Sequence, residues 1–397
     1  MSILKVDNIR HNNATSDAIT MASDGTCPAK LTSVGGGQLS NRNKARNGAM
    51  KISQRATTFS TTTSDTYLID GWMTQHGSSG NLDCTITQST DAPPGFTKSL
   101  KITPDSTNTP SGSQNGMLVQ RLEGQELQDF AFGTSDAKTI TVSWYAKTSA
   151  TGAGNYTVKV EYSPDGSQGN VYAVNKLFAF TTTWTRYTYT IPATGTATSV
   201  GIVDSNAFGF RIEYHLFAGP DDVHSQFTQW TSNSSPTYKV ISGQKNFMDN
   251  TNNELYITGL QIEVGDTETS FEHRTYSDEL LRCQRYFTFA PSGTVFPGRG
   301  NSGSSYIYSY QSTVPMRVSP TIGTSNDIAH GTFGVRRYRD GTGVSDSTST
   351  PTTSSTYFSP NSNMIHLIQG GFSGADDRSA TLFVSGGAIT ISAEFTF

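Results

Sequence analysis

The chain has 397 residues and a net charge of −4, with 34% hydrophobic and 15% charged residues. That length exceeds one ordinary hydrophobic core and predicts two or three domains. An aromatic content of 11% argues against a disordered chain, and the small negative charge argues against nucleic acid as a partner. Abundant Thr, Tyr, Phe and Val, with 38 glycines, favour short strands joined by turns, so we expect an all-β protein.

Neither a membrane span nor a signal peptide is expected. No run of about 18 apolar residues occurs, and the first twenty residues lack the apolar stretch that export requires. We therefore expect a soluble protein that is made in the cytoplasm and does not insert into a membrane. The three cysteines, Cys27, Cys84 and Cys283, are far apart and odd in number, which predicts free buried thiols.

Residues 1–50 are predicted to form an extended N-terminal arm. A short strand is expected at residues 3–9, and residues 33–47 are rich in glycine and then basic, with almost no apolar side chains. Such a stretch cannot bury a core of its own. We expect partners to order this arm, which suits attachment to a larger assembly.

Residues 51–275 are predicted to form an antiparallel β-sandwich, of jelly-roll type. Apolar and polar residues alternate with a period of two in residues 139–147, 156–162, 187–191, 208–216 and 254–264. Trp144 falls on the apolar face of its segment and is assigned to the core. Turn-rich sequences between these segments separate the strands.

A short helix is predicted at residues 276–290 as a connector. Thr275 can cap its start, and Asp278 and Glu279 suit the positive end of the helix dipole. Its apolar stripe consists of Leu280, Cys283 and Phe287. Beyond it, residues 291–397 return to alternating strands and polar loops, which predicts a second, smaller C-terminal β-sandwich.

Catalytic and metal-binding patterns are scarce. The seven histidines are scattered, and no nucleophile elbow, zinc motif or phosphate-binding glycine loop is present, so we expect neither an enzyme nor a cofactor. Two loops carry closely spaced oxygen ligands that calcium could use. Their candidate ligands are Asp249 and Glu254 in the first loop, and Asp340 and Asp346 in the second. Asx-rich turns have the same composition without any ion, and this alternative is favoured.

Exposed aromatic side chains are the candidates for sugar contact, because their rings stack on sugar faces. The candidates are Tyr306, Tyr308, Tyr338, Tyr357 and Trp230. For each of them, ordinary packing in a core or a subunit interface is the favoured alternative. The C-terminal tyrosines are of most interest, since loops on a rigid β-scaffold often carry binding variation.

One sequence signature carries a family resemblance. Residues 260–287, LQIEVGDTETSFEHRTYSDELLRCQRYF, resemble a recurrent motif of virion and tail-fibre proteins of tailed bacteriophages, common in marine podoviruses. The matching residues are Glu263, Gly265, Phe271, Glu272, Arg274, Tyr276, Glu279, Leu280, Cys283, Gln284, Arg285 and Tyr286. Residues 39–58 resemble the entry to the same domain, but Lys44, Ala45 and Arg46 replace its usual apolar residues. The opening residues MSILKVDNI also resemble the first strand of such fibre proteins.

The resemblance implies a carbohydrate-binding-like jelly roll and assembly as a homotrimer. A stripe as short as that of the predicted helix is not stable alone in water, so the helix packs against its own domain or against two symmetry mates. We favour the trimer axis. The candidate trimer contacts are Leu280, Cys283, Phe287, Arg282 and Arg285.

Three functions remain open at this point. The first is a non-enzymatic subunit of a phage tail fibre, in the virion, whose residues 1–50 bind tail or portal-proximal adaptor proteins and whose distal domain binds a host glycan or outer-membrane receptor. The second is a head fibre or decoration protein without a receptor role. The third, a polysaccharide depolymerase, is disfavoured because the sequence lacks a β-helix repeat or an acid cluster.

Overall fold

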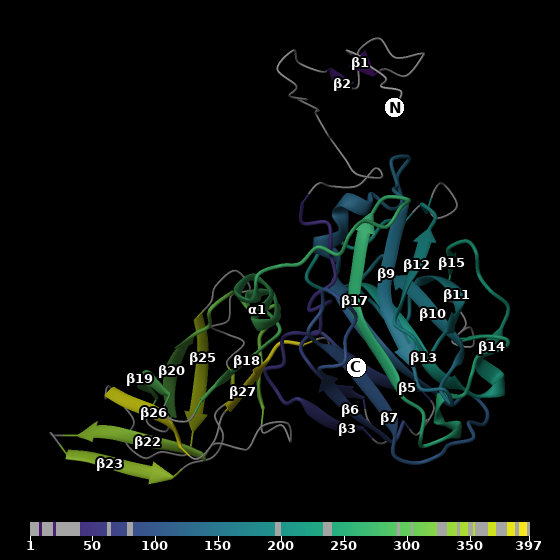
Figure 1. Ribbon diagram of the computed structural model, residues 1–397. Coiled ribbons are helices and arrows are strands. Elements are labelled where there is room, and N and C mark those ends of the chain that lie inside the picture. Colours follow the sequence, from purple (N-terminus) through teal and green to yellow (C-terminus); the bar gives the residue numbers. More distant parts are fainter. Residues whose placement is uncertain are drawn as a thin grey trace, which may run out of the picture.

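The structure is a computed structural model that describes most of the chain from residue 40 onward. The described residues are 8–9, 19–20, 40–61, 65–77, 82–194, 200–232, 240–291, 294–302, 305–323, 332–339, 342–347, 352–353, 364–370, 379–385 and 389–394. Helix α1 (Tyr276–Gln284) lies between a large and a small β-domain (Figure 1). Strands dominate the described residues, so the predicted all-β class is confirmed.

The large domain is an antiparallel β-sandwich of two sheets. The seven-stranded sheet has the order β15 (Thr231–Ser232), β11 (Tyr172–Phe180), β10 (Gly154–Tyr162), β13 (Phe208–Ala218), β8 (Asn115–Glu123), β5 (Met73–Gly77) and β4 (Thr66–Tyr67). The six-stranded sheet has the order β12 (Thr185–Ile191), β9 (Ile140–Thr148), β17 (Leu255–Val264), β7 (Ser99–Pro104), β6 (Cys84–Ser89) and β3 (Thr58–Thr61). Strands β9, β10, β12, β13 and β17 are the five segments whose alternation predicted strands, so the sandwich prediction is confirmed.

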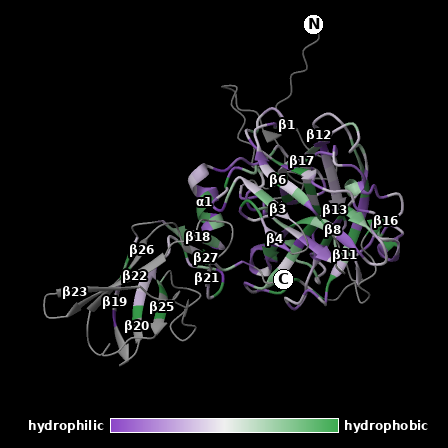
Figure 2. Ribbon diagram, turned by 90° about the horizontal axis from the view of Figure 1, so that it is seen from below, coloured by the Kyte–Doolittle hydropathy of each residue, from purple (hydrophilic) through white to green (hydrophobic). Residues whose placement is uncertain are grey.

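The core lies between the two sheets and is rich in aromatic rings. Trp144 on β9 is fully buried, and its ring meets Phe178 at 4.9 Å and Tyr214 at 5.4 Å between centroids, both edge-on. Edge-to-face pairs of this kind add to the stabilisation from area burial. Apolar residues accordingly concentrate inside the sandwich (Figure 2).

The outer face of the seven-stranded sheet carries a buried charge network. Lys159 and Glu161 on β10 lie opposite Glu213 and Arg211 on β13 in the antiparallel register. Arg211 Nε lies 2.7 Å from Glu213 Oε1, Lys159 Nζ lies 3.6 Å from Glu213 Oε2, and all four residues are at most 9% exposed. Burial alone would raise the pKa of Glu213, but Arg211, Lys159 and His215 hold that pKa well below its ordinary value.

The predicted arm boundary at residue 50 is wrong, because residues 40–50 are part of the sandwich. Ala45 and Met50 are fully buried in its core. Asn43 Nδ2 donates to the carbonyl of Leu260 at 3.0 Å, and the backbone of this segment continues to bond β17, with Lys44 N donating to Ile262 O at 2.8 Å. Backbone and amide contacts anchor a segment that has few apolar residues. Nearer the N-terminus, β1 (Asn8–Ile9) pairs with β2 (Ile19–Thr20), and the rest of residues 1–39 lies outside the described residues.

The predicted helix and the second β-domain are both present. Helix α1 begins after Thr275, whose hydroxyl accepts a bond from Asp278 N at 3.2 Å, but it ends at Gln284, earlier than expected. The small domain has two sheets, one with the order β18 (Phe287–Ala290), β27 (Ile389–Ser392) and β21 (Thr321–Gly323). The other has the order β23 (Thr342–Ser347), β22 (Thr332–Arg339), β26 (Ser379–Ser385), β19 (Val295–Ser302), β20 (Ser305–Gln311), β25 (Met364–Gly370) and β24 (Thr352–Thr353).

Buried polar contacts join the two domains. Arg55 of the sandwich forms an ion pair at 2.9 Å with Glu394, and both side chains are at most 4% exposed. Arg317 of the small domain donates from Nη1 to Asn206 O in the sandwich at 2.9 Å, and from Nε to Ala393 O at 2.8 Å. These contacts fix the small domain against the sandwich beside α1.

Candidate functional site

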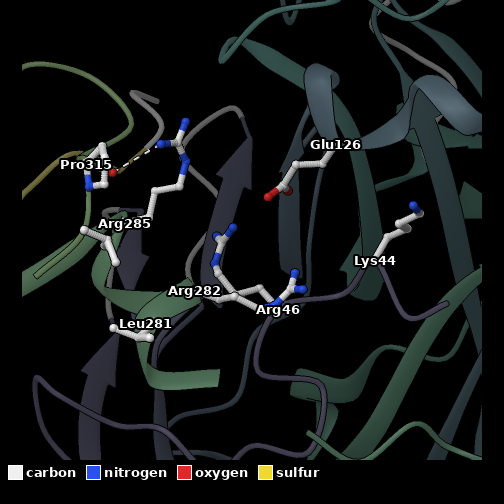
Figure 3. Close-up of a pocket in the computed structure, with 8 residues that line it drawn as sticks. Lys44, Arg46, Glu126, Leu281, Arg282, Arg285 and Pro315 are labelled. Carbon is white, nitrogen blue, oxygen red and sulfur yellow. Dashed lines mark hydrogen bonds between the residues drawn. The ribbon is translucent and has the colours of Figure 1, made fainter. Parts of the chain in front are cut away.

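A cavity of about 240 Å³ lies where the sandwich, α1 and the small domain meet (Figure 3). It is lined by Lys44, Arg46, Glu126, Leu281, Arg282, Arg285, Val314 and Pro315. Residues 44 and 46 come from the segment that precedes β3, and residue 126 comes from the 3₁₀ helix η1 (Gly124–Phe130). Residues 281 and 282 lie in the last turn of α1, and residue 285 follows its last residue. Four basic side chains and one acidic side chain therefore share one hollow with an apolar edge.

Arg46 is the most buried of these cations, at 5% exposure. Its guanidinium stacks on the ring of Tyr286, with Cζ 3.4 Å from the ring centroid, and its Nε and Nη1 have no hydrogen-bond partner. Its backbone is held in place, since Arg46 N donates to Gln120 Oε1 at 3.1 Å and Gln120 Nε2 donates back to Arg46 O at 2.7 Å. These two nitrogens are closed to solvent, so a ligand in the hollow would meet only the remaining part of the guanidinium.

Arg285 lines the cavity and forms a bidentate ion pair with Glu123. Its Nε and Nη2 each lie 2.7 Å from one carboxylate oxygen of Glu123, at the end of β8, and its Nη1 donates to Pro315 O at 3.2 Å. The hydroxyl of Tyr286 donates to the same carboxylate at 2.6 Å. The charge of Arg285 is thus matched by that of Glu123, which is fully buried.

Among the described residues that line the cavity, Glu126 is the only one with an acidic side chain. Burial and the neighbouring Glu123 raise its pKa, against the lowering effect of Arg46, Arg282 and Arg285. In Figure 3 its carboxyl group points toward the middle of the hollow, on the side opposite the guanidinium groups of Arg46 and Arg282. Its protonated form would be a hydrogen-bond donor inside a cationic pocket.

The remaining two cations differ in how they are matched. Lys44 Nζ lies 2.7 Å from Asp129 Oδ2, so its charge is neutralised locally. Arg282 is exposed and has no ion-pair partner among the described residues. Because Glu123 balances Arg285 and Asp129 balances Lys44, the charges of Arg46 and Arg282 are left to Glu126, with a further contribution to Arg46 from Glu394. The cavity therefore has the electrostatics of an anion-binding site.

The signature at residues 260–287 forms hydrogen bonds and an ion pair within the chain. Glu272 accepts from Asn43 N at 2.9 Å, and Glu279 accepts from Asn47 N at 2.6 Å. Arg274 Nη1 donates to Ala45 O at 2.9 Å and lies 3.2 Å from Glu279. The signature thus holds the segment 40–50 against β17 and α1.

Two of the five candidate trimer contacts are buried inside their own chain, which contradicts that part of the prediction. Cys283 and Phe287 are 1% and 2% exposed, and Phe287 starts β18 instead of extending the helix. Arg285 is half-buried and forms an ion pair with Glu123 of its own chain. Leu280 is half-buried and Arg282 is exposed, so these two remain candidates.

Two of the five candidate sugar contacts are core residues. Tyr308 is fully buried in the small domain, and Trp230 is 6% exposed, with Nε1 donating to Pro192 O at 2.9 Å. Both corrections follow the same reason, since large aromatic rings are the main filling of β-sandwich cores. Tyr306 and Tyr338 lie on β20 and β22, but their side chains, like all of Tyr357, are outside the described residues.

In the first candidate calcium loop, each of the two carboxylates forms an ion pair with a lysine. Asp249 Oδ2 lies 2.8 Å from Lys245 Nζ, and Glu254 Oε1 lies 2.5 Å from Lys101 Nζ, so the two acids do not converge. Within the described part of the chain, no group of three His, Cys, Asp or Glu side chains could hold a metal ion. Asp340 lies outside the described residues, and Asp346 lies on β23 with its side chain undescribed.

The predicted thiols and the missed cavity residues complete the comparison with the sequence. Cys84 and Cys283 are free and buried, as expected, and burial raises the pKa of each. The cavity was not predicted. Its signal was the replacement of apolar signature residues by Lys44 and Arg46, which both line it.

Comparisons with known proteins find similar solved structures at low sequence identity and assign the chain to no family. No protein-family model and no curated protein matches it. Similar solved structures include the enzymatically active domain of tailspike protein 4 of bacteriophage CBA120, at 11% identity and a TM-score of 0.31, covering 56% of this chain and 21% of that one. A second is the CBM22-1 xylan-binding domain of Paenibacillus barcinonensis Xyn10C, at 13% identity and a TM-score of 0.25, covering 53% of this chain and 95% of that one. A third is the family 11 carbohydrate-binding module of Clostridium thermocellum Lic26A-Cel5E, at 9% identity and a TM-score of 0.26, covering 55% of this chain and 98% of that one.

These likenesses are too low to say what the chain binds. The chain spans about a fifth of the length of the tailspike domain that it matches. Among the described residues, no helix is both long and apolar enough to cross a membrane.

Proposed function

We propose that the chain is a non-enzymatic structural subunit of a bacteriophage tail fibre. Its N-terminal residues attach to the virion through tail or adaptor proteins, and its small C-terminal domain contacts the host surface, through a glycan or an outer-membrane receptor. The observation that carries the proposal is the use of the phage-like signature: Glu272, Arg274, Glu279 and Arg285 all bind other parts of the same chain. A motif used in this way is part of the scaffold.

The same contacts give the subunit a fixed joint between its two domains. Because Arg55, Arg317 and Glu394 are buried at that joint, the small domain cannot swing freely against the sandwich. A fixed joint suits a fibre, which has to hold its distal domain away from the particle. Many weak contacts at the distal end then give strong adhesion through multivalency.

Self-association as a homotrimer belongs to this proposal. The large apolar side chains that α1 leaves exposed are Tyr276, at 61%, and Leu281, at 39%. Tyr276 and Leu280 replace Cys283 and Phe287 as the contacts that a threefold axis would use, whereas Leu281 and Arg282 line the cavity. Light scattering at micromolar concentration is expected to give a trimer, and a monomer would contradict this part of the proposal.

Adsorption competition tests the function itself. The purified full chain is expected to slow the adsorption of the phage that encodes it, because it occupies the same receptors. Unchanged adsorption at saturating protein would favour a head fibre or decoration protein. Release of reducing ends from host polysaccharide would instead favour a depolymerase.

A further inference from the structure

We propose that the cavity beside α1 binds a compact hydroxylated carboxylate, such as a hexuronic acid unit of an acidic polysaccharide. The inference deepens the proposed adhesion, and rests on it for the source of the ligand. The site is distinct from the candidate aromatic contacts of the small domain. It consists of Arg46 and Arg282 as the anion-binding groups, Glu126 as the facing polar group, and an apolar edge of Leu281, Val314 and Pro315.

Arg46 and Arg282 give the cavity a positive charge. Arg46 is 5% exposed and lines the cavity, while Arg282 has no ion-pair partner among the described residues. Guanidinium groups bind planar carboxylates through paired, charge-assisted hydrogen bonds. A carboxylate bound beside them would offset positive charge that the single facing carboxyl group of Glu126 does not balance.

The size of the cavity restricts the ligand to a small molecule or a single sugar unit. A cavity of about 240 Å³ holds the volume of about eight water molecules, since one water occupies about 30 Å³ in the liquid. That is room for one ring-sized group, and too little for a folded segment of another protein. The walls are also fixed, because the ion pair between Arg285 and Glu123 and the bonds between Arg46 and Gln120 hold both sides.

The rest of the lining favours a sugar acid over a simple anion. Glu126 faces the two guanidinium groups across the hollow, and its carboxyl group can donate to or accept from a hydroxyl. Leu281, Val314 and Pro315 offer an apolar surface to the carbon face of a ring. A ligand that uses all three kinds of lining needs a carboxylate, hydroxyls and an apolar face, and an acidic amino-acid side chain has no hydroxyls.

Titration of the full chain with D-galacturonate, followed by ligand-observed NMR, tests the proposal. D-galactose, acetate and N-acetylglutamate serve as comparison ligands. Galacturonate is expected to bind at least about tenfold more tightly than each of them, because each lacks the carboxylate, the hydroxyls or the ring. Equal binding of acetate or N-acetylglutamate would overturn the saccharide assignment, and a folded protein that does not bind galacturonate would overturn the site.

Matched variants locate the binding. Arg282→Gln removes an exposed charge and is expected to weaken galacturonate binding about tenfold, whereas Arg299→Gln, an exposed arginine of the small domain, is expected to leave it unchanged. Arg46→Lys retains the charge but loses the planar fork, and should weaken binding as well; circular dichroism checks its folding. Equal effects of Arg282→Gln and Arg299→Gln would overturn the assignment of the cavity.

The outcomes distinguish this inference from the proposed function. Competition for adsorption without galacturonate binding would refute the cavity as a saccharide site and leave the fibre proposal standing. Galacturonate binding without competition would refute the adhesive role and leave the site standing.

Discussion

Arg285, at the C-terminal end of α1, forms a bidentate ion pair with the carboxylate of Glu123 at the end of β8, and both contacts measure 2.7 Å. The two residues are 162 positions apart in the chain, and Glu123 is fully buried. This ion pair attaches the helix to the sandwich. Tyr286 donates to the same carboxylate, and Arg285 also donates to Pro315 O of the small domain, so these contacts connect all three parts.

Arg285→Met is therefore expected to destabilise the protein by about 3 kcal/mol, because it leaves a buried carboxylate without its cation. Arg282→Met on the same helix is the control, and should change the free energy of unfolding by no more than about 0.5 kcal/mol, since that side chain is exposed. Urea unfolding followed by tryptophan fluorescence measures both. Equal stability of the two variants would contradict a structural role for the ion pair.

Gly48→Ala tests whether residues 40–50 belong to the sandwich. A Cβ at this position would collide with the carbonyl oxygen of Leu260 on β17, so the substitution is expected to cost about 1–3 kcal/mol or more. Gly169→Ala is the matched control, because its Cβ would lie 3.7 Å from the nearest atom, the Oγ of Ser167. If thermal unfolding of Gly48→Ala matched that of the wild type, the segment would not be packed as described.

Glu126→Gln tests the electrostatics of the cavity through pH. The groups around Glu126 are Glu123 from β8, Lys44 and Arg46 from the preceding segment, and Arg282 and Arg285 from α1. Since burial and Glu123 raise the pKa of Glu126 in the folded chain, the folded state binds more protons than the unfolded state above about pH 4.5. Wild-type stability is thereby lowered as the pH rises through this window, and the glutamine variant escapes the effect.

The melting temperature of Glu126→Gln relative to wild type is accordingly expected to increase between about pH 4 and about pH 7. Differential scanning calorimetry across that range measures it. A difference that stays constant would contradict a shifted pKa, and one that shrinks as the pH rises would mean that the pKa is lowered in the folded chain.

Glu213→Gln tests the charge network on the outer sheet face with the opposite sign. The pKa of Glu213 is held well below its ordinary value, so its ionised form stabilises the fold above about pH 4.5, and this stabilisation is lost as the pH falls through the lower folded pKa. The variant should lose about 3–5 kcal/mol near pH 7, and its deficit against wild type should shrink in acid. Glu268→Gln, an exposed control, should stay within about 0.5 kcal/mol of wild type throughout.

The strands were predictable because their signal is local. Alternation with a period of two in β9, β10 and β13 identified the core faces, including Trp144. The opposite faces were harder to read. Lys159, Glu161 and Glu213 have the composition of a solvated face, yet they are buried, because cross-strand partners neutralise them. Periodicity identifies which side chains share a face, and does not say whether that face is covered.

The candidate site was much less predictable than the fold. The cavity combines Lys44, Glu126, Arg285 and Pro315, which are far apart in the sequence and come together only through tertiary packing. Sequence spacing grouped Cys283 and Phe287 on one helical stripe, but the helix ends at Gln284, and both side chains pack into their own chain. A stripe of three apolar residues indicates burial, and does not identify the partner.

The location of the chain on the particle tests the central claim most directly. Particles of the encoding phage can be labelled with gold-conjugated antibodies against the small C-terminal domain and viewed by electron microscopy. If the chain is a tail-fibre subunit whose small domain is distal, the label will lie at the outer ends of the tail appendages. Label on the capsid, or particles that carry none, would contradict it.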